Sequence, residues 1–278
     1  MSRLLVVALL VALTACSASG EAPPEKSGIE VSLGFTQLLP DEGTPKGLLR
    51  VVNEGDEPLA VTGAGLRWSG YGPEFTREQD ATIAPGQTLD LRVLLPEARC
   101  DEGKEPISGV VSTADETKVQ ELTTSGQQFL RRLWLRGCRD ALVAENVKIS
   151  YAPGWRIAPD DESLDGTLRM VRQEGSEPVT VLNSDGSVLY DLVLPRQVTL
   201  VADDPRVDVP LSIRPGNRCD EHAIGQATAP FTFRIGVRVG DGPGATETLV
   251  LVTPPVKIQK QAGRMLLDYC ERKAGSRR

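Results

Sequence analysis

The feature that most constrains the fold of this chain is an internal duplication. Three pairs of segments match in the same order and at nearly the same spacing: 47–52 with 166–171, 54–58 with 174–178, and 96–102 with 215–221. The first and third pairs are 119 residues apart, and the third pair contains the same motif, PxxRCDE, in both copies. A period of this length is that of a domain rather than a solenoid repeat. The sequence therefore predicts two copies of one domain.

Each copy ends in a similar segment, 127–138 or 261–270, which predicts a short helix with a cysteine near its end. Besides Cys16, the chain has four cysteines: Cys100, Cys138, Cys219 and Cys270. An even number in an exported chain favours disulfides, and four cysteines allow three pairings. The repeat selects the pairing within each copy, Cys100 with Cys138 and Cys219 with Cys270. In the chain-entropy model each bridge contributes about 4 kcal/mol to stability.

The body of each copy has the pattern of short β-strands. In 231–239 (FTFRIGVRV) apolar residues alternate with polar or small ones, and a Gly- and Pro-rich turn separates this segment from the β-branched run 246–252. Further candidate strands are 29–34, 48–53, 59–62, 88–95, 107–112 and 117–122 in the first copy, and 147–150, 167–172, 179–182, 188–194 and 207–213 in the second. The pattern predicts an all-β protein with two tandem immunoglobulin-like antiparallel β-sandwich domains, each closed by a short C-terminal helix and one disulfide.

The first residues predict export and lipid anchoring. Arg3 precedes an apolar run, 4–12, which is too short to span a bilayer as a mature helix. The residues that follow, Leu-Thr-Ala-Cys at 13–16, resemble the lipobox of bacterial lipoproteins, in which the signal peptide is removed before the cysteine. This resemblance implies that Cys16 carries a diacylglycerol, with acyl chains such as palmitate, on the extracytoplasmic face of the cell membrane. The alternative is an ordinary secretory signal cut near Ala18.

These observations predict a domain organisation: a lipoprotein signal peptide at 1–15, a lipidated flexible tether at 16–28, and immunoglobulin-like domains at 29–140 and 141–278. The tether has no aromatic residue and no apolar run, so it cannot form a core of its own. The junction between the domains is expected between residues 140 and 146.

The charge of the chain argues against two classes of partner. The formal net charge is −7, and loss of Arg3 with the signal peptide would make it −8. A negative surface disfavours nucleic acid, and it disfavours protein docking on anionic lipid headgroups. We therefore expect contact with the membrane through the lipid anchor and no nucleic-acid partner.

The repeated RCDE motif is expected to be structural. Zinc sites and thiol redox sites need closely spaced ligand pairs such as CxxC, and nucleophilic catalysis needs a base, which is most often histidine. The chain has a single histidine, His222, and no CxxC. We expect the cysteine of the motif to be in a disulfide, the aspartate to cap a turn, and the arginine to pair with an acidic neighbour or a carbonyl. The sequence predicts no catalytic residue, no metal site and no cofactor.

Among the other polar and aromatic residues, two are candidates for binding and the rest are expected to be structural. Glu221 and His222 are the candidate binding residues, because the first copy has Gly103 and Lys104 where His222 and Ala223 stand. The acidic segments 160–162 and 203–204 are expected to be solvated loops, and the arginines of 131–136 a solvated helix face. Trp68, Tyr71 and Trp155 could stack on a sugar but are expected to pack in cores.

A broader resemblance concerns mainly the second copy. The run RCDEHA at 218–223, the strand at 231–239 and a terminal helix ending in Cys270 resemble a group of uncharacterised exported lipoproteins of high-GC Gram-positive bacteria. This resemblance implies a location and a fold but no activity.

We therefore expect a non-enzymatic binding or structural module of the cell envelope, with an envelope protein or glycan as partner. One alternative is a solute-binding lipoprotein of an ABC transporter, which would have two α/β lobes. A further alternative is an envelope hydrolase that acts through carboxylates.

Overall fold

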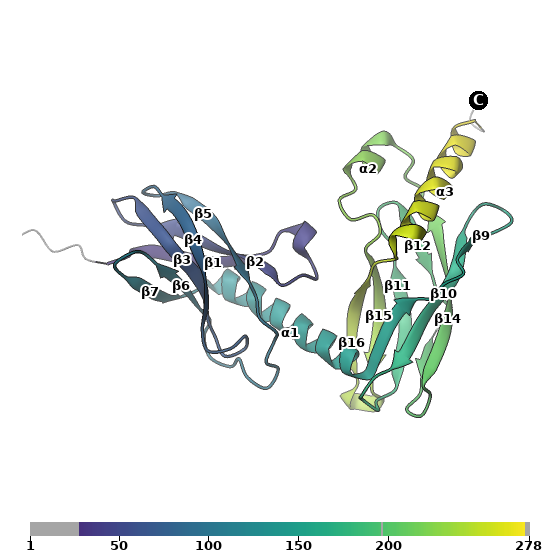
Figure 1. Cartoon of the computed structure of the whole chain (residues 1–278), viewed down its shortest axis with the longest axis horizontal. Helices are drawn as coiled ribbons and strands as arrows, with labels where there is room; N and C mark the ends of the chain where they lie inside the picture. The colour runs from purple at the N-terminus through teal and green to yellow at the C-terminus, as the bar shows by residue number, and fades with distance from the viewer. Residues whose placement is uncertain (1–27, 196, 276–278) are drawn as a thin grey trace, which may run out of the picture.

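The computed structural model describes residues 28–195 and 197–275, in which two β-sandwich domains are joined by a long helix (Figure 1). Each domain has its own cluster of buried apolar side chains. Cys16 and nearly all of the expected signal peptide and tether lie outside the described residues, so lipid anchoring stays a prediction. Among the described residues, no helix is both long and apolar enough to cross a membrane.

Domain 1 is a sandwich of two antiparallel sheets. One sheet has the order β1 (Val31–Thr36), β2 (Lys46–Asn53), β5 (Thr88–Leu94). The other has the order β4 (Phe75–Ile83), β3 (Leu59–Arg67), β6 (Ser108–Ser112), β7 (Thr117–Glu121). A short 3-10 helix, η1 (Leu39–Asp41), lies in the loop between β1 and β2, and α1 (Thr124–Asn146) follows β7.

Domain 2 repeats this arrangement and adds to it. One sheet has the order β12 (Tyr190–Val193), β14 (Arg206–Pro215), β10 (Leu164–Arg172), β8 (Val147–Tyr151), with β9 (Arg156–Ile157) also paired to β10. The other has the order β13 (Val198–Leu200), β11 (Val179–Asp185), β15 (Phe233–Val239), β16 (Thr246–Val252). Outside the sheets are α2 (Glu221–Gln226), η2 (Gly242–Gly244) and α3 (Val256–Gly275). The pairings between these strands are antiparallel, which confirms the predicted all-β sandwich fold.

The structure explains why the segments 47–52 and 166–171 match. Gly47 in β2 and Gly166 in β10 each lie against an aromatic ring, Phe35 in the first domain and Trp155 in the second, so a Cβ at either glycine would collide with the ring. Three residues after each glycine, an arginine pairs with an aspartate on the neighbouring strand: Arg50 with Asp90 at 2.8 Å, and Arg169 with Asp208 at 2.9 Å. The repeated sequence thus encodes the centre of one sheet in each domain.

The repeated EGxEP turns are also held in equivalent ways by different residues. Asn53 is buried at the end of β2, and its Nδ2 donates to the carbonyl oxygens of Glu57 and Ile83. Arg172 stands at the end of β10, and its guanidinium donates to the carbonyl oxygens of Glu177 and of the last residue of β13. The Oδ1 of Asn146 also accepts from the backbone N–H of Glu177, so in domain 2 an arginine and an asparagine share the contacts that Asn53 makes alone in domain 1.

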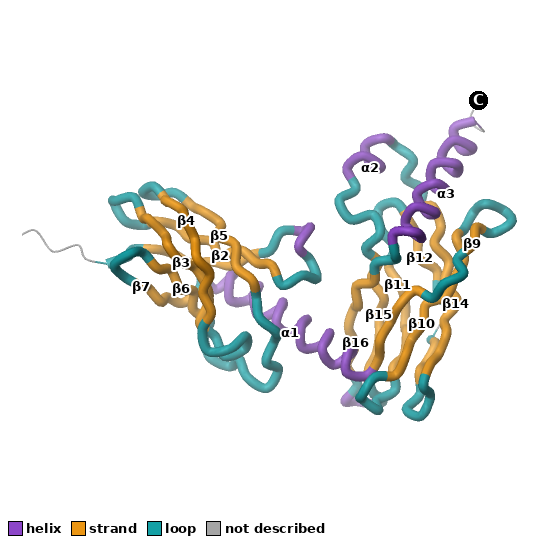
Figure 2. Tube along the Cα trace, in the orientation of Figure 1, coloured by secondary structure: helices purple, strands orange, loops and turns teal. Residues whose placement is uncertain are grey.

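The two helices at the ends of the copies are much longer than expected. α1 has 23 residues and α3 has 20, whereas the sequence indicated short helices at 127–138 and 261–270. The expected junction at 140–146 lies within α1, which continues directly to β8 (Figure 2). Val143, in the last turns of α1, is buried in the core of domain 2, which explains why the helix does not end at residue 140.

Three strands, β4, β9 and β13, were not expected from the sequence. β4 carries mainly polar residues, and although Phe75, Ala81 and Ile83 pack against the core, Arg77 and Gln79 interrupt the apolar alternation. β9 and β13 have 2 and 3 residues, too few for a periodic pattern to be recognised. β4 and β13 both lie at the edge of a sheet, where burial constrains the sequence least.

Both disulfides follow the expected pairing, Cys100 with Cys138 and Cys219 with Cys270, with a Cα–Cα distance of 5.5 Å in each. Cys138 and Cys270 occupy the same place, fourteen residues after the first residue of α1 and of α3. Each bridge thus ties the PxxRCDE loop of its domain to the closing helix.

Candidate functional site: the cleft between the domains

The two domains meet through the η1 loop of domain 1. The carboxylate of Glu42 accepts a hydrogen bond from Arg136 Nη1 of α1 at 3.1 Å and another from Arg234 Nη2 of β15 at 2.6 Å. The next residue, Gly43, has a φ of +76° and lies against the side chain of Leu251 in β16. A side chain at this position would be strained and would also collide with Leu251. One acidic side chain and one glycine therefore connect domain 1 to the sheet of domain 2.

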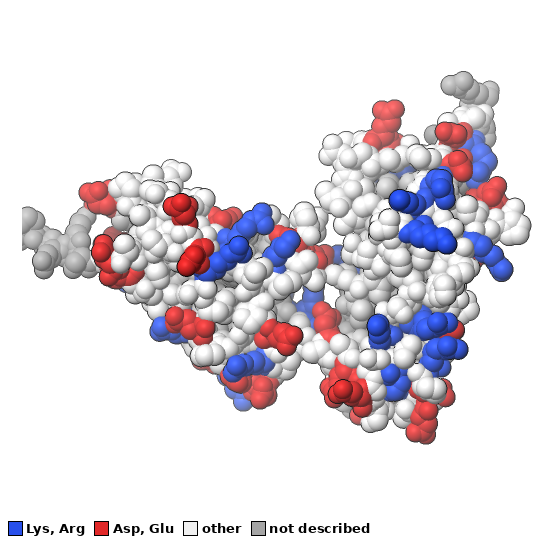
Figure 3. Space-filling view, in the orientation of Figure 1, with Lys and Arg blue, Asp and Glu red and all other residues white. Residues whose placement is uncertain are grey.

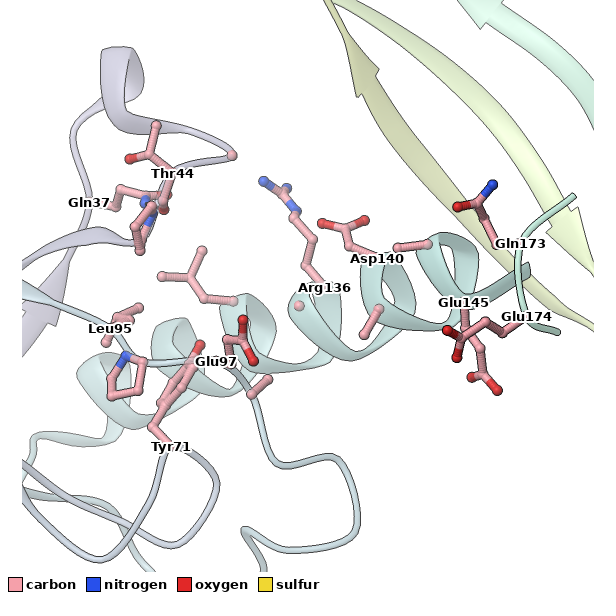
Figure 4. Close-up of a pocket in the computed structure, with 18 residues that line it drawn as sticks. Gln37, Thr44, Tyr71, Leu95, Glu97, Arg136, Asp140, Glu145, Gln173 and Glu174 are labelled. Carbon is pink, nitrogen blue, oxygen red and sulfur yellow. Dashed lines mark hydrogen bonds between the residues drawn. The ribbon is translucent and has the colours of Figure 1, made fainter. Parts of the chain in front are cut away.

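A groove of about 730 Å³ runs along α1 beside this contact (Figure 4). Small residues on one face of α1 form the floor of this groove and leave space above the helix: Gly137, Ala141 and Ala144. Tyr71 and Glu97 lie at the domain 1 end, as Figure 4 shows. Acidic side chains predominate in its lining: Glu97, Asp140, Glu145 and Glu174, against the single cation Arg136. We call this cavity the acidic groove.

Two groups in the acidic groove have shifted pKa values. Desolvation raises the pKa of Asp140 above its ordinary value, and the nearby positive charge of Arg136 opposes this shift. Burial likewise raises the pKa of the Tyr71 phenol. Asp140 therefore holds its proton to a higher pH than a carboxylate in water, which is a property of groups in partly enclosed sites.

A second cavity, of about 400 Å³, uses the other part of the η1 loop. Domain 1 contributes Leu39, Pro40 and Glu42, and domain 2 contributes α2 and the segment 226–230 that follows it. His222 lines this cavity, which we call the His222 pocket, whereas Glu221 does not. Of the two candidate binding residues, the structure therefore brings one to a cavity formed by both domains.

The second RCDE motif positions His222. Asp220 is the N-cap of α2, and its Oδ1 accepts a hydrogen bond from the backbone N–H of Ala223 at 2.8 Å. Arg218 donates from Nε to the same carboxylate at 2.8 Å, and these contacts lower the pKa of Asp220 to about 2. The capped helix starts directly after the disulfide at Cys219, so the motif fixes the first turn of α2, on which His222 lies.

The first RCDE motif has the same covalent role but different neighbours. Arg99 pairs with Glu102 at 3.5 Å, and the carbonyl oxygen of Arg99 accepts from Trp134 Nε1 of α1 at 3.1 Å. No helix starts directly after this motif, because the chain turns at Gly103, which packs on Trp68. The expected structural role of the motif is confirmed for the cysteine and arginine of both copies, and the capping aspartate is confirmed in the second.

The remaining candidates are placed as follows. Trp68 and Trp155 are buried, and Tyr71 packs edge-on against Trp68, which confirms their packing role. The acidic segments 160–162 and 203–204 are exposed, as expected. The expectation of a solvated arginine face is wrong for Arg131, which donates to two backbone carbonyl oxygens and lies over the Trp68 ring. Among the described residues, no group of three His, Cys, Asp or Glu side chains could hold a metal ion.

Sequence reasoning missed the cleft itself. Its key contact joins Glu42 to Arg136 and Arg234, residues that are 94 and 192 positions away in the sequence. Single charged residues at such distances form no recognisable motif. The one available signal was the small-residue spacing of Gly137, Ala141 and Ala144, which indicates a helix face that leaves space beside it.

Comparison with known proteins gives distant similarity only. The sequence matches no protein-family model and no curated protein. A crystal structure of red sea bream transglutaminase is similar with a TM-score of 0.26 and 13% identity, over 81% of this chain and 31% of that one. A Ca²⁺-stabilized adhesin that helps an Antarctic bacterium bind ice is similar with a TM-score of 0.20 and 12% identity, over 80% of this chain and 48% of that one. This chain thus spans less than half the length of either, and the description of its fold rests on the strand pairings given above.

Proposed function

We propose that this protein is a lipid-anchored binding protein on the extracytoplasmic face of the cell membrane, without enzymatic activity of its own. Its partner is a protein or glycan of the envelope, which it engages in the cleft between its two domains. The lipobox-like residues 13–16 and the short apolar run before them are the sequence features that support this location.

The observation that carries this proposal is the His222 pocket. Binding sites are commonly concave, mainly apolar and provided with a few convergent polar groups, and they occur preferentially where domains meet. The apolar lining here includes Leu39, Pro40 and Val188, and the polar groups are His222 and Arg218. A disulfide and a capped helix hold the domain 2 wall, so the pocket is preorganised for a partner.

The proposed binding role is tested by filling the pocket. Ala229 is exposed and lines the pocket, so Ala229→Arg would insert a long cation without disturbing a core. Ala114→Arg, in an exposed turn at the other end of domain 1, is the matched control. Affinity capture from envelope extracts should recover a partner with the natural chain and the control, and lose it with Ala229→Arg. Equal recovery with all three chains would refute the assignment of the pocket.

The proposed location is tested separately. A Cys16→Ala variant should be released into the medium or remain unprocessed, because the cleavage and acylation both require the cysteine thiol. Mass spectrometry of the natural chain should find the acyl chains on the N-terminal peptide. Membrane retention of a processed Cys16→Ala chain would contradict anchoring at this residue.

Two alternative functions were the solute-binding lipoprotein of a transporter and the carboxylate-dependent hydrolase. The described domains are antiparallel sandwiches, so the α/β lobes expected of a transporter solute-binding lipoprotein are not those seen here. A carboxylate-dependent hydrolase remains a second candidate because the acidic groove contains Asp140, with its raised pKa, among other carboxylates. Hydrolysis of a cell-wall glycan that is lost on Asp140→Asn and kept on Glu54→Gln would support that function instead.

A further inference from the structure

We propose that a second site, separate from the His222 pocket, binds a chain-like polyanion that carries phosphate or carboxylate groups. The site is a groove of about 560 Å³ between α1 and the outer face of the domain 2 sheet formed by β11, β15 and β16. We call it the basic groove. It does not depend on what occupies the His222 pocket.

Three arginines of α1 line one wall of the basic groove: Arg132, Arg136 and Arg139. Their spacing places them on one face of the helix, over roughly 10 Å of its length at 1.5 Å per residue. This face differs from the one that forms the floor of the acidic groove, and Arg136 lies at the boundary of the two. A row of guanidinium groups of this length suits a ligand with several anionic groups in sequence rather than a single ion.

The positive charge of this row is largely uncompensated. Arg132 and Arg139 have no ionic partner among the described residues; the Arg132 guanidinium lies over the Phe129 ring, 5.4 Å from its centroid. Arg136 shares the carboxylate of Glu42 with Arg234 and also lies near Asp140, so the uncompensated charge of the row is that of Arg132 and Arg139. In a chain with a net charge of −7, such a concentration of cations has a clear binding preference for anions.

The facing wall adds polar and apolar contacts. The acid in the lining, Glu247, is already paired with Arg238 at 2.8 Å and so does not neutralise the arginines of α1. Asn183 and Thr248 also line the wall, and their side chains have no hydrogen-bond partner in the described part of the chain. Leu135 and Leu249 are 44% and 47% exposed and would contact the uncharged backbone of a ligand.

The shape of the site favours a strand-like polyanion over a membrane surface. The arginines face the sheet of domain 2 across a groove, and a flat bilayer cannot enter it. The end of domain 1 at which the described chain begins is acidic (Figure 3). Its exposed acidic residues are Glu30, Glu54, Asp56, Glu57, Asp115 and Glu116. Anionic headgroups would be repelled there.

The test uses linear inorganic tripolyphosphate as the probe, titrated into the oxidised protein by isothermal titration calorimetry at low and high salt. Tripolyphosphate should bind, and binding should weaken as salt rises. Arg132→Gln and Arg139→Gln should each weaken it about tenfold, since each removes charge-assisted hydrogen bonds. Arg92→Gln, an exposed arginine on β5 of domain 1, is the matched control and should leave the affinity unchanged.

Two further arms identify the source of the anionic groups. Inorganic monophosphate should bind more weakly than tripolyphosphate, because it reaches fewer arginines. Vesicles rich in anionic phospholipid should not bind the chain, because a bilayer cannot enter the basic groove. The proposal is overturned if tripolyphosphate fails to bind at low salt, if Arg92→Gln weakens binding as much as Arg139→Gln, or if vesicles bind and tripolyphosphate does not.

Discussion

Glu42 is predicted to set the angle between the two domains. Its carboxylate accepts from Arg136 at 3.1 Å and from Arg234 at 2.6 Å, and about a quarter of its side chain is exposed. Arg136 lies on the part of α1 that the Cys100–Cys138 disulfide ties to domain 1, so only the pair with Arg234 crosses between the domains. A partly exposed ion pair of this kind contributes up to about 1 kcal/mol. Glu42→Gln would keep the side-chain shape, remove the charge and leave two arginines facing each other across the cleft. The ratio of open to closed arrangements should then rise about fivefold.

This change can be measured as a distance distribution between the domains. Spin labels attached to ketone-bearing amino acids at Glu78 of β4 and Lys260 of α3, both exposed, would leave the native disulfides intact. Double electron–electron resonance should give a narrow distribution for the natural chain and a broader one, with added longer distances, for Glu42→Gln. Glu54→Gln removes the same charge from the far end of domain 1 and should change nothing. Identical distributions for all three chains would show that α1 alone fixes the angle, and would refute the role given to Glu42.

The remaining predictions concern stability and pH. Asn53→Ala should lower the free energy of unfolding, measured by denaturant titration, by about 2 kcal/mol, because it leaves backbone groups at the end of β2 without partners. The control Asn217→Ala replaces an exposed side chain and should change the free energy of unfolding little. Replacing both cysteines of the second disulfide by serine should cost about 4 kcal/mol in the same assay. Because the pKa of Asp220 is lowered in the folded chain, the N-cap contributes its full stability above the unfolded-state pKa of about 4. This contribution is lost as the pH falls through about 2. The chemical shift of the Ala223 amide proton, which Asp220 accepts, should therefore titrate near pH 2 and not near pH 4.

The duplication explains why much of the fold could be predicted from this single sequence. Gly47 and Gly166 recur because each lies under an aromatic ring at the centre of a sheet, and Arg50 and Arg169 recur because each pairs across the same two strands. Because each domain needs these same contacts at the same place in its sheet, the same residue types recur at the same spacing in both copies. The cysteine of each closing helix is fixed in the same way, by the loop to which it is bonded.

The site was less predictable because its residues are held by contacts with residues far away in the sequence, which leave no local pattern. Val143 extends α1 by packing into the core of the following domain, a fact that a helical pattern ending near a cysteine does not reveal. Gly43 and Glu42 lie in a loop whose position is decided by Leu251 and Arg234 of the other domain. His222 is predictable as a candidate because it breaks the symmetry of the repeat, and the structure places it in a cavity to which domain 1 also contributes.

The most direct test of the proposed function is photo-crosslinking in the living cell. A photoreactive amino acid at His222 lines the pocket between the domains, and one at Glu78 lies on the exposed strand β4 of domain 1. A chain that binds an envelope partner in the cleft should form a discrete crosslinked product from position 222 and none from position 78, and Ala229→Arg should abolish it. Absence of a product at position 222, or the same products from both positions, would contradict the assignment of the cleft as the binding site.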